Sequence, residues 1–141
     1  MSRRSFDMPH VVGFEDTNLV GNVYYTRYFS WQGRCRELFL REHAPQTLDA
    51  LTRGELRLVT AHASCDFADE FSVFDEVLVR MTLNCLIAFG VSLNFDFCRS
   101  SAPAEALARG RQDIKFLRRQ GAGWELCDMP EALLAAVRRY E

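Results

Sequence analysis

The sequence lacks the features that mark several classes of protein. It contains no run near the roughly eighteen apolar residues of a membrane-spanning helix, and its start, MSRRSFDMPH, has no apolar signal region. Seventeen basic residues against nineteen acidic ones give a formal net charge of −2, which offers no global reason to expect nucleic acid as a partner. We therefore expect a cytoplasmic protein that binds neither a membrane nor nucleic acid.

Cysteine, histidine and glycine also form no pattern of a metal or cofactor site. The five cysteines are odd in number and include no C-x-x-C pair, so we interpret them as reduced thiols, four of which lie in apolar-patterned segments where cysteine packs as a small hydrophobe. His10, His43 and His62 lack the spacing of metal ligands or of a catalytic triad, and we interpret all three as structural. The glycines form no phosphate-binding loop, so the sequence implies no metal and no cofactor.

What is present is the composition of one globular domain. The chain has 141 residues, of which 48% are hydrophobic, and a chain of this length buries about two-thirds of its unfolded surface. We expect residues 1–141 to form a single domain of the α+β class, with one long helix packed on a curved antiparallel sheet. Apolar periodicity and turn residues predict its elements: a strand at 9–15, a helix at 22–43 with Asn22 as N-cap, a short helical turn at 46–54, strands at 55–69, 77–87, 91–97 and 105–119, an extended piece at 124–127, and a final helix opened by Asp128 with Pro130 in its first turn.

Two details of these elements are also predicted. Strands 77–87 and 91–97 alternate apolar and polar residues on either side of a tight turn, which indicates a hairpin. Gly110 interrupts the alternation of strand 105–119, and we expect it to permit a β-bulge.

The long helix has an apolar half and a charged half when its residues are placed 100° apart. Arg36 falls on the apolar half, between Gln32 and Leu40, whereas Glu37 lies on the charged half and is expected to pair with Arg41. A guanidinium on the apolar half needs a carboxylate, backbone carbonyls or an anionic substrate group as partner. A structural ion pair or a place at a wet subunit interface explains Arg36 as well as a functional role does.

The turn at residues 16–21 leads directly into this helix. The N-terminus of a helix presents free N–H groups and a partial positive charge, which stabilise an oxygen that develops negative charge. An oxyanion hole is therefore one interpretation of the turn. Simple capping of the helix by Asn18 or Asn22 is the alternative.

The same residues resemble a known family. The stretch F-E-D-T-N-L-V-G-N-V-Y-Y-x-x-Y-F-x-W, from Phe14 to Trp31, resembles the start of hotdog proteins like 4-hydroxybenzoyl-CoA thioesterase, whose pattern is D-x-D-x-x-G-x-V-Y-x-x-x-Y. The run W-Q-G-x-C-R-E, from Trp31 to Glu37, resembles the hotdog thioesterases of enediyne polyketide clusters. The resemblance implies a hotdog fold, dimers that join two sheets edge to edge with active sites between subunits, and a dimer of dimers.

The sequence departs from the general pattern at Asn18, where the second acidic residue of D-x-D would stand. An uncharged amide neither accepts a proton usefully at neutral pH nor forms an anhydride, so covalent catalysis at this position is not expected. Asparagine is the rule in the enediyne group, and the resemblance implies that Asn18 orients the attacking water or the thioester. It implies further that the backbone N–H near Tyr25 polarises the carbonyl and that Arg36 stabilises negative charge. Tyr28 and Gln32 are expected to bind substrate.

The implied substrate is a polyene polyketide chain, with a 3-keto or 3-hydroxy group, on the acyl carrier domain of an iterative synthase. Hydrolysis would release an acid, and a 3-keto acid can lose carbon dioxide to give a methyl ketone or polyene. An acyl-CoA thioesterase of the same fold and a non-catalytic acyl-binding or carrier-docking protein are the alternatives, the latter because of Asn18. A hotdog dehydratase is disfavoured, because it needs a histidine paired with a carboxylate and none of the three histidines lies in the motif.

Overall fold

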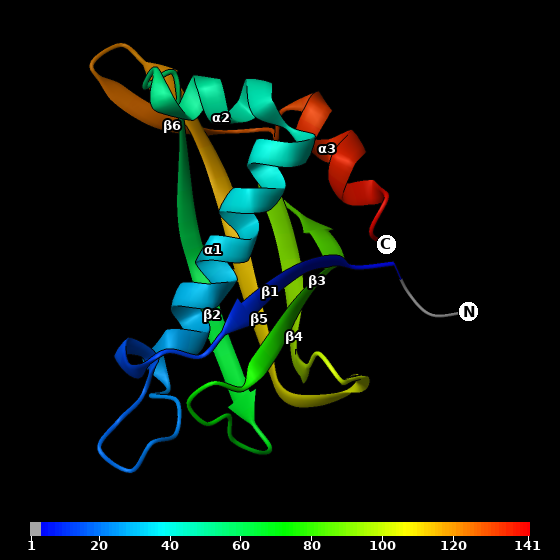
Figure 1. Cartoon of the computed structure of the whole chain (residues 1–141). Coiled ribbons are helices and arrows are strands. Elements are labelled where there is room, and N and C mark those ends of the chain that lie inside the picture. The colour runs from blue at the N-terminus through cyan, green and yellow to red at the C-terminus, as the bar shows by residue number, and fades with distance from the viewer. Residues whose placement is uncertain (1–3) are drawn as a thin grey trace.

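A computed structural model describes residues 4–141 (Figure 1). The strands are β1 (Phe6–Val11), β2 (Leu56–Phe67), β3 (Glu76–Ile87), β4 (Gly90–Arg99), β5 (Ala102–Gln120) and β6 (Gly123–Cys127). The helices are the single turn η1 (Phe14–Asp16), the long α1 (Thr26–His43), and the short α2 (Pro45–Thr52) and α3 (Glu131–Arg138).

All strand pairs are antiparallel, and the strands follow the order β1-β3-β4-β5-β2, with β6 also paired to β5. Figure 1 shows the sheet curving around α1, with α2 and α3 at one end of the helix and the loops at residues 12–25 and 68–75 at the other. Strand β5 is the longest at 19 residues and pairs with three neighbours, β4, β2 and β6, whereas β4 is the middle strand of the order. The predicted α+β class and the long helix on a curved sheet are confirmed.

Most predicted elements lie where the sequence patterns place them. The long helix ends at His43, the short helix α2 covers the predicted turn, and β3 and β4 form the predicted hairpin. The first strand lies earlier than expected, because β1 ends at Val11 and the η1 turn takes the last residues of the predicted strand. Pro130 is the N-cap of α3 and does not lie in its first turn.

The predicted start of the long helix at Asn22 is wrong. Helix α1 begins at Thr26, because the preceding residues are held in extended pairing: Asn22 bridges Ser72, and the Val23 N–H donates to the Phe71 carbonyl at 2.9 Å. Asn22 is therefore no cap, and its side-chain nitrogen donates to Glu70. A contact between distant segments has overridden a local helix signal.

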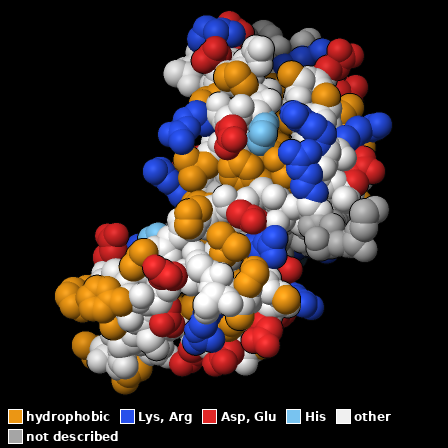
Figure 2. Space-filling view, turned by 45° about the vertical axis from the view of Figure 1, so that its right-hand side comes forward, with side chains coloured by type: hydrophobic (Ala, Val, Ile, Leu, Met, Phe, Trp, Pro, Cys, Tyr) orange, Lys and Arg blue, Asp and Glu red, His pale blue; other side chains and the backbone are white. Residues whose placement is uncertain are grey.

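One end of the molecule exposes large apolar side chains. Figure 2 shows hydrophobic and acidic side chains gathered at the lower end, where the two loops lie in Figure 1. The rings of Phe14 and Phe74 contact each other there in a tilted arrangement with centroids 5.5 Å apart, and Leu19 and Val20 are almost fully exposed. Within residues 4–141, no helix is both long enough and apolar enough to cross a membrane.

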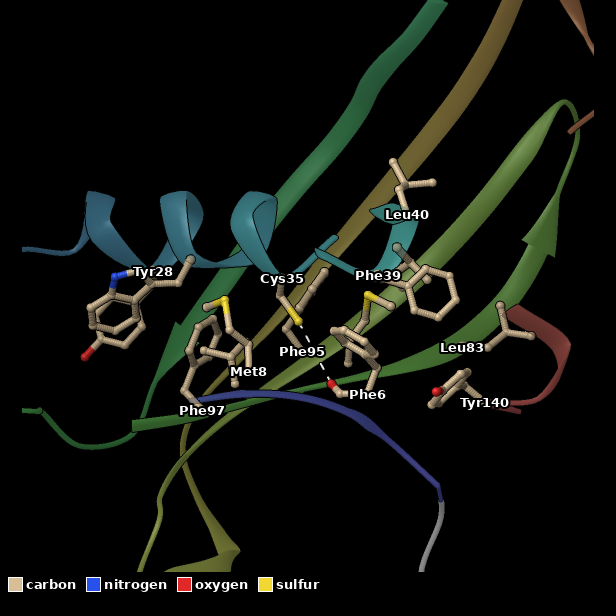
Figure 3. Close-up of a cluster of buried hydrophobic side chains, with 14 of the residues drawn as sticks. Phe6, Met8, Tyr28, Cys35, Phe39, Leu40, Leu83, Phe95, Phe97 and Tyr140 are labelled. Atoms are coloured by element: carbon tan, nitrogen blue, oxygen red, sulfur yellow. Dashed lines mark hydrogen bonds between the residues drawn. The ribbon is translucent and has the colours of Figure 1, made fainter. Parts of the chain in front are cut away.

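The core lies between α1 and the concave face of the sheet (Figure 3). Phe95, Phe97 and Phe39 are fully buried there, and the ring of Phe39 meets that of Phe6 edge to face at 5.4 Å. The Cys35 thiol donates to the Phe6 carbonyl at 3.9 Å, so the cysteine fills the core as a small hydrophobe with a weak donor. This packing fixes which face of α1 meets the sheet.

Candidate active site

The loop between β1 and α1 is anchored by the carboxylate of Asp16. This side chain is buried, its Oδ2 accepts from the Gly13 N–H at 2.9 Å, and the same oxygen lies 2.9 Å from His10 Nε2. The Asp16 carbonyl accepts from the Tyr24 N–H at 2.8 Å, which closes the loop on itself. The carboxylate thus holds the loop in one shape.

His10 is the residue of this site that sequence reasoning missed. Its ring packs on Trp31 of α1 at 5.0 Å, so His10 connects the first strand, the loop and the helix. His10 lies outside the motif, as the sequence shows, but the chain reverses after Val11 and brings Asp16 of the motif back to it, so one histidine is paired with a carboxylate. An open cavity of about 530 Å³ adjoins the pair and is also lined by Glu15 and Arg27, among others.

Asn18 lies at the exposed tip of the loop. Its Oδ1 accepts from the Val20 N–H at 3.0 Å, and its backbone N–H donates to the Asn22 carbonyl at 2.9 Å. The Asn18 amide nitrogen donates to no acceptor within residues 4–141. The side chain is therefore fixed through its oxygen and presents its N–H groups outward.

Tyr25 is the N-cap of α1, and its side chain is exposed. Its backbone N–H meets no acceptor in the described part of the chain, as expected for a helix that has no capping side chain. That group is consequently available to a ligand oxygen. The exposure of Asn18 nearby leaves this end of the helix open.

Arg36 lies half-buried between α1 and the sheet. Its Nη1 donates to Gln112 Oε1 on β5 at 2.7 Å and to Thr60 Oγ1 on β2 at 3.4 Å. No carboxylate of residues 4–141 forms a salt bridge with it, and burial lowers the pKa of its guanidinium although Glu37 partly opposes this. Glu37 pairs with Arg34 at 3.9 Å and not with Arg41, so that predicted ion pair is wrong.

Tyr28 and Gln32 lie inside the single chain. Tyr28 packs among aromatic rings of the core, and burial raises the pKa of its hydroxyl to about 12. Gln32 is fully buried; its Nε2 donates to the Ser64 carbonyl at 3.2 Å, and its Oε1 is without a partner in the described residues. Their role in binding substrate stays a prediction.

Gly110 lets the side chain of Gln32 pack against strand β5, and it does not form a β-bulge. It pairs regularly with Cys65 on β2 and with Phe95 on β4, and the irregularity of the β2–β5 pairing lies at Thr60 and His62 instead. A Cβ atom at Gly110 would overlap the side-chain amide of Gln32. The predicted bulge is therefore wrong, because the glycine admits a helix side chain against the strand.

The thiols lie apart from one another, and all five cysteines are free. Burial raises the pKa of both Cys35 and Cys65 to about 12, with smaller contributions from nearby carboxylates. Across residues 4–141, no group of three or more His, Cys, Asp and Glu side chains is placed to hold a metal ion.

Asn18 and Arg36 are not brought together within one chain. Arg36 is the eleventh residue of α1, which places it ~15 Å along the axis from the helix start at Thr26. Asn18 lies beyond that start, in the loop at the far end of the helix (Figure 1). The structure brings His10 to the loop and Gln112 to Arg36, and it leaves these two clusters separate.

A long helix wrapped by an antiparallel sheet of this order is a hotdog fold. The chain belongs to the thioesterase-like superfamily, whose family model matches residues 12–137. It is similar to the dynemicin thioesterase, whose crystal structures are described as revealing induced-fit and allosteric effects upon polyene binding. The two share 46% identity over 97% of each chain, with a TM-score of 0.89. The chain is a thioester hydrolase, and its resemblance to the enediyne thioesterases is confirmed.

More distant structures share the fold. A 1,4-dihydroxy-2-naphthoyl-CoA thioesterase from Synechocystis is 20% identical over 96% of each chain, with a TM-score of 0.84. A gentisyl-coenzyme A thioesterase is 22% identical over 94% of this chain and 98% of its own, with a TM-score of 0.76. Among curated proteins, none matches the chain.

Proposed function

We propose that this hydrolase releases a polyene polyketide chain from the acyl carrier domain of an iterative enediyne synthase. The observation that carries the proposal is Arg36, a half-buried cation whose side-chain partners among residues 4–141 are both neutral. Such a guanidinium retains donors and charge for an anionic group of the reacting acyl chain. The 46% identity with the dynemicin thioesterase, which binds a polyene, supports this substrate class.

In the proposed reaction a water molecule attacks the thioester carbon, and the electron pair of the carbonyl moves onto its oxygen. The Asn18 amide orients the water or the thioester, while the Tyr25 N–H and Arg36 stabilise the negative oxygen. When the carbonyl re-forms, the carbon–sulfur bond breaks and the thiolate takes up the proton that the water releases. The products are a free acid and the carrier thiol, and no cofactor takes part.

The active site is proposed to form between two chains. Within one chain Arg36 lies ~15 Å along the helix axis from the helix start, so Arg36 in one subunit would serve Asn18 of a second copy. Strand β2 is an edge strand, paired on one side to β5, and its free edge suits the joining of two sheets. We propose a cytoplasmic dimer of dimers in which residues 1–141 form one domain.

The released acid has a further fate in this proposal. If the bound chain carries a 3-keto group, the free 3-keto acid loses carbon dioxide and leaves a methyl ketone or conjugated polyene. That loss follows hydrolysis and requires no residue of the enzyme. A 3-hydroxy chain would be released as the stable hydroxy acid.

Chain release from a loaded synthase tests the proposal. The purified synthase is loaded with its polyketide chain, and free product is measured by mass spectrometry with and without this protein. We expect the protein to increase free product and to empty the carrier domain. An unchanged carrier-bound chain would overturn the proposal and leave a non-catalytic acyl-binding or docking role.

A second comparison separates the remaining alternative. The same acyl group is offered on the carrier domain and on CoA, and initial rates are measured at equal substrate concentrations. Faster hydrolysis of the carrier thioester is expected. Preference for the CoA thioester would identify an acyl-CoA thioesterase of the same fold.

A further inference from the structure

Helix α1 and strand β5 meet along a polar seam with two layers. Gln32 and Arg36 are four residues apart on the helix, which is about 6 Å along its axis, and Gly110 and Gln112 are two residues apart on the strand, which is about 7 Å. The two spacings nearly match, so each helix side chain faces one strand position. Gln32 lies over Gly110, and Arg36 meets Gln112.

Arg36 donates two hydrogen bonds to the sheet, and the bond to Gln112 is the shorter one. Its Oε1 lies 2.7 Å from Arg36 Nη1, against 3.4 Å for Thr60 Oγ1, and its side chain is 4% exposed. A short bond between two partly buried groups fixes the direction of the planar guanidinium, because Arg36 cannot turn without losing it. Arg36 Nε and Nη2 donate to no group of residues 4–141 and remain free for a ligand.

The neutrality of Gln112 matters as much as its position. A carboxylate at the same distance would form a charge-assisted bond and compensate the positive charge of Arg36. The amide provides an acceptor of the same geometry without that compensation, so the cation keeps its attraction for a developing oxyanion. Ser92 on β4 pairs with Asp113 on β5, and both side chains point to the face of the sheet opposite that of Gln112. On that face the carboxylate of Asp113 pairs with Arg111 at 2.8 Å.

We infer that Gln112 is a positioning residue for thioester hydrolysis, which holds Arg36 in its working orientation and leaves its charge uncompensated. The inference rests on the proposed role of Arg36 in stabilising the oxyanion. Gln112 itself touches neither the thioester nor the attacking water. Its effect is therefore exerted on kcat, through the charge that Arg36 presents to the transition state.

Two variants of the intact protein test this. Gln112→Glu keeps the size of the side chain and adds a carboxylate, whereas Gln112→Leu removes the acceptor; Gln120→Glu, at the exposed end of the same strand, is the matched control. Steady-state hydrolysis is measured with a medium-chain acyl thioester that the wild type turns over, together with thermal unfolding. We expect Gln112→Glu to unfold no earlier than wild type with kcat at least tenfold lower and KM within threefold.

Setting kcat against stability separates positioning from packing. The adjacent Arg36 guanidinium lowers the pKa of the introduced carboxyl, so Gln112→Glu stays ionised and its kcat should remain at least tenfold below wild type from pH 7 to pH 5.5, without loss of thermal stability. Gln112→Leu should lower both kcat and thermal stability, and the control should match wild type. A folded Gln112→Glu variant with kcat within twofold of wild type, or one whose kcat falls only together with its thermal stability, would overturn the inference.

This experiment is independent of the proposed natural substrate. A wild type that hydrolyses the simple thioester but leaves the carrier-bound polyene intact contradicts the proposed substrate and leaves the role of Gln112 to be decided by the variants. If Arg36→Ala retains full turnover of the simple thioester, Arg36 does not act on the oxyanion. In that case the inference about Gln112 fails with it.

Discussion

His10 Nε2 lies 2.9 Å from Asp16 Oδ2, and this contact ties the first strand to the loop that carries Asn18. An ionised carboxylate only accepts hydrogen bonds, so the nitrogen that faces it is the protonated one. The loop is thereby fixed at its base, while its tip stays exposed. The relationship leads to a prediction about stability.

His10→Ala should lower the free energy of unfolding by about 1–3 kcal/mol, because the buried carboxylate of Asp16 then loses one of the two groups that donate hydrogen bonds to it. His10→Gln retains a donor and should lose less. Urea denaturation measures both, with His62→Ala on an exposed stretch of β2 as control, expected within about 0.5 kcal/mol of wild type. Equal effects of His10→Ala and His62→Ala would show that the contact with Asp16 contributes nothing.

Arg36→Ala should lower kcat by about a hundredfold or more, the usual effect of removing an oxyanion donor, and Asn18→Ala should also slow turnover. Arg36→Lys keeps the charge but not the planar fork, so an intermediate loss is expected. Arg41→Ala, on the exposed face of the same helix, is the control. Size-exclusion chromatography confirms folding, and full turnover in both alanine variants would disprove the site assignment.

Gly110→Ala should destabilise the protein by about 1–3 kcal/mol, because the added methyl displaces the side chain of Gln32. In the Gln32→Ala background the same change should cost less by at least about 0.5 kcal/mol. Gly33→Ala, in a helix position with nothing within 4 Å of the added atom, should instead raise stability by about 0.5–1 kcal/mol. Thermal unfolding is measured for Gly33→Ala and for the double-mutant cycle of wild type, Gly110→Ala, Gln32→Ala and the double variant. Additive effects in the cycle would exclude the Gln32 contact as the cause.

Alkaline pH should destabilise the fold through its buried thiols. Burial raises the pKa of Cys35 and Cys65 to about 12 from the ordinary value of 9.0, so the folded state holds protons that the unfolded state releases. Their contribution is complete below about pH 9 and declines as pH rises toward 12, by up to about 1.4 kcal/mol per pH unit for Cys35 and by less for Cys65, which is half-buried and screened by solvent. Denaturation curves between pH 8 and 11 should show a shallower decline for Cys35→Ala than for wild type. Cys85→Ala, an exposed position, is the control, and a slope equal to wild type in Cys35→Ala would contradict the prediction.

The sequence predicts those features that depend on near neighbours. The period of the long helix and the alternation of the β3–β4 hairpin are local, and both are confirmed. Arg36 also stood out locally, because a helix wheel shows which face a residue occupies. Its acceptor, Gln112, is 76 residues away in the chain and was invisible until the sheet was in place.

The failures have the same physical origin. Asn22 reads as a helix cap, but its bridge to Ser72 on a distant loop competes successfully with helix formation. Gly110 reads as a bulge, because the pattern within one strand does not reveal a helix side chain pressing against it. His10 and Asp16 meet only through a reversal of the chain. Each error arises where a tertiary contact decides a local conformation.

The seam between Gln32 and Gly110 constrains how this sequence can change over evolutionary time. A Cβ atom at position 110 would overlap the side-chain amide of Gln32 and would also lie 3.0 Å from the Ser64 carbonyl oxygen, so a smaller residue at position 32 removes the more severe of the two contacts. A change at position 32 therefore lowers the cost of a later change at position 110. Across a set of homologues, the two positions should covary although 78 residues separate them in the chain.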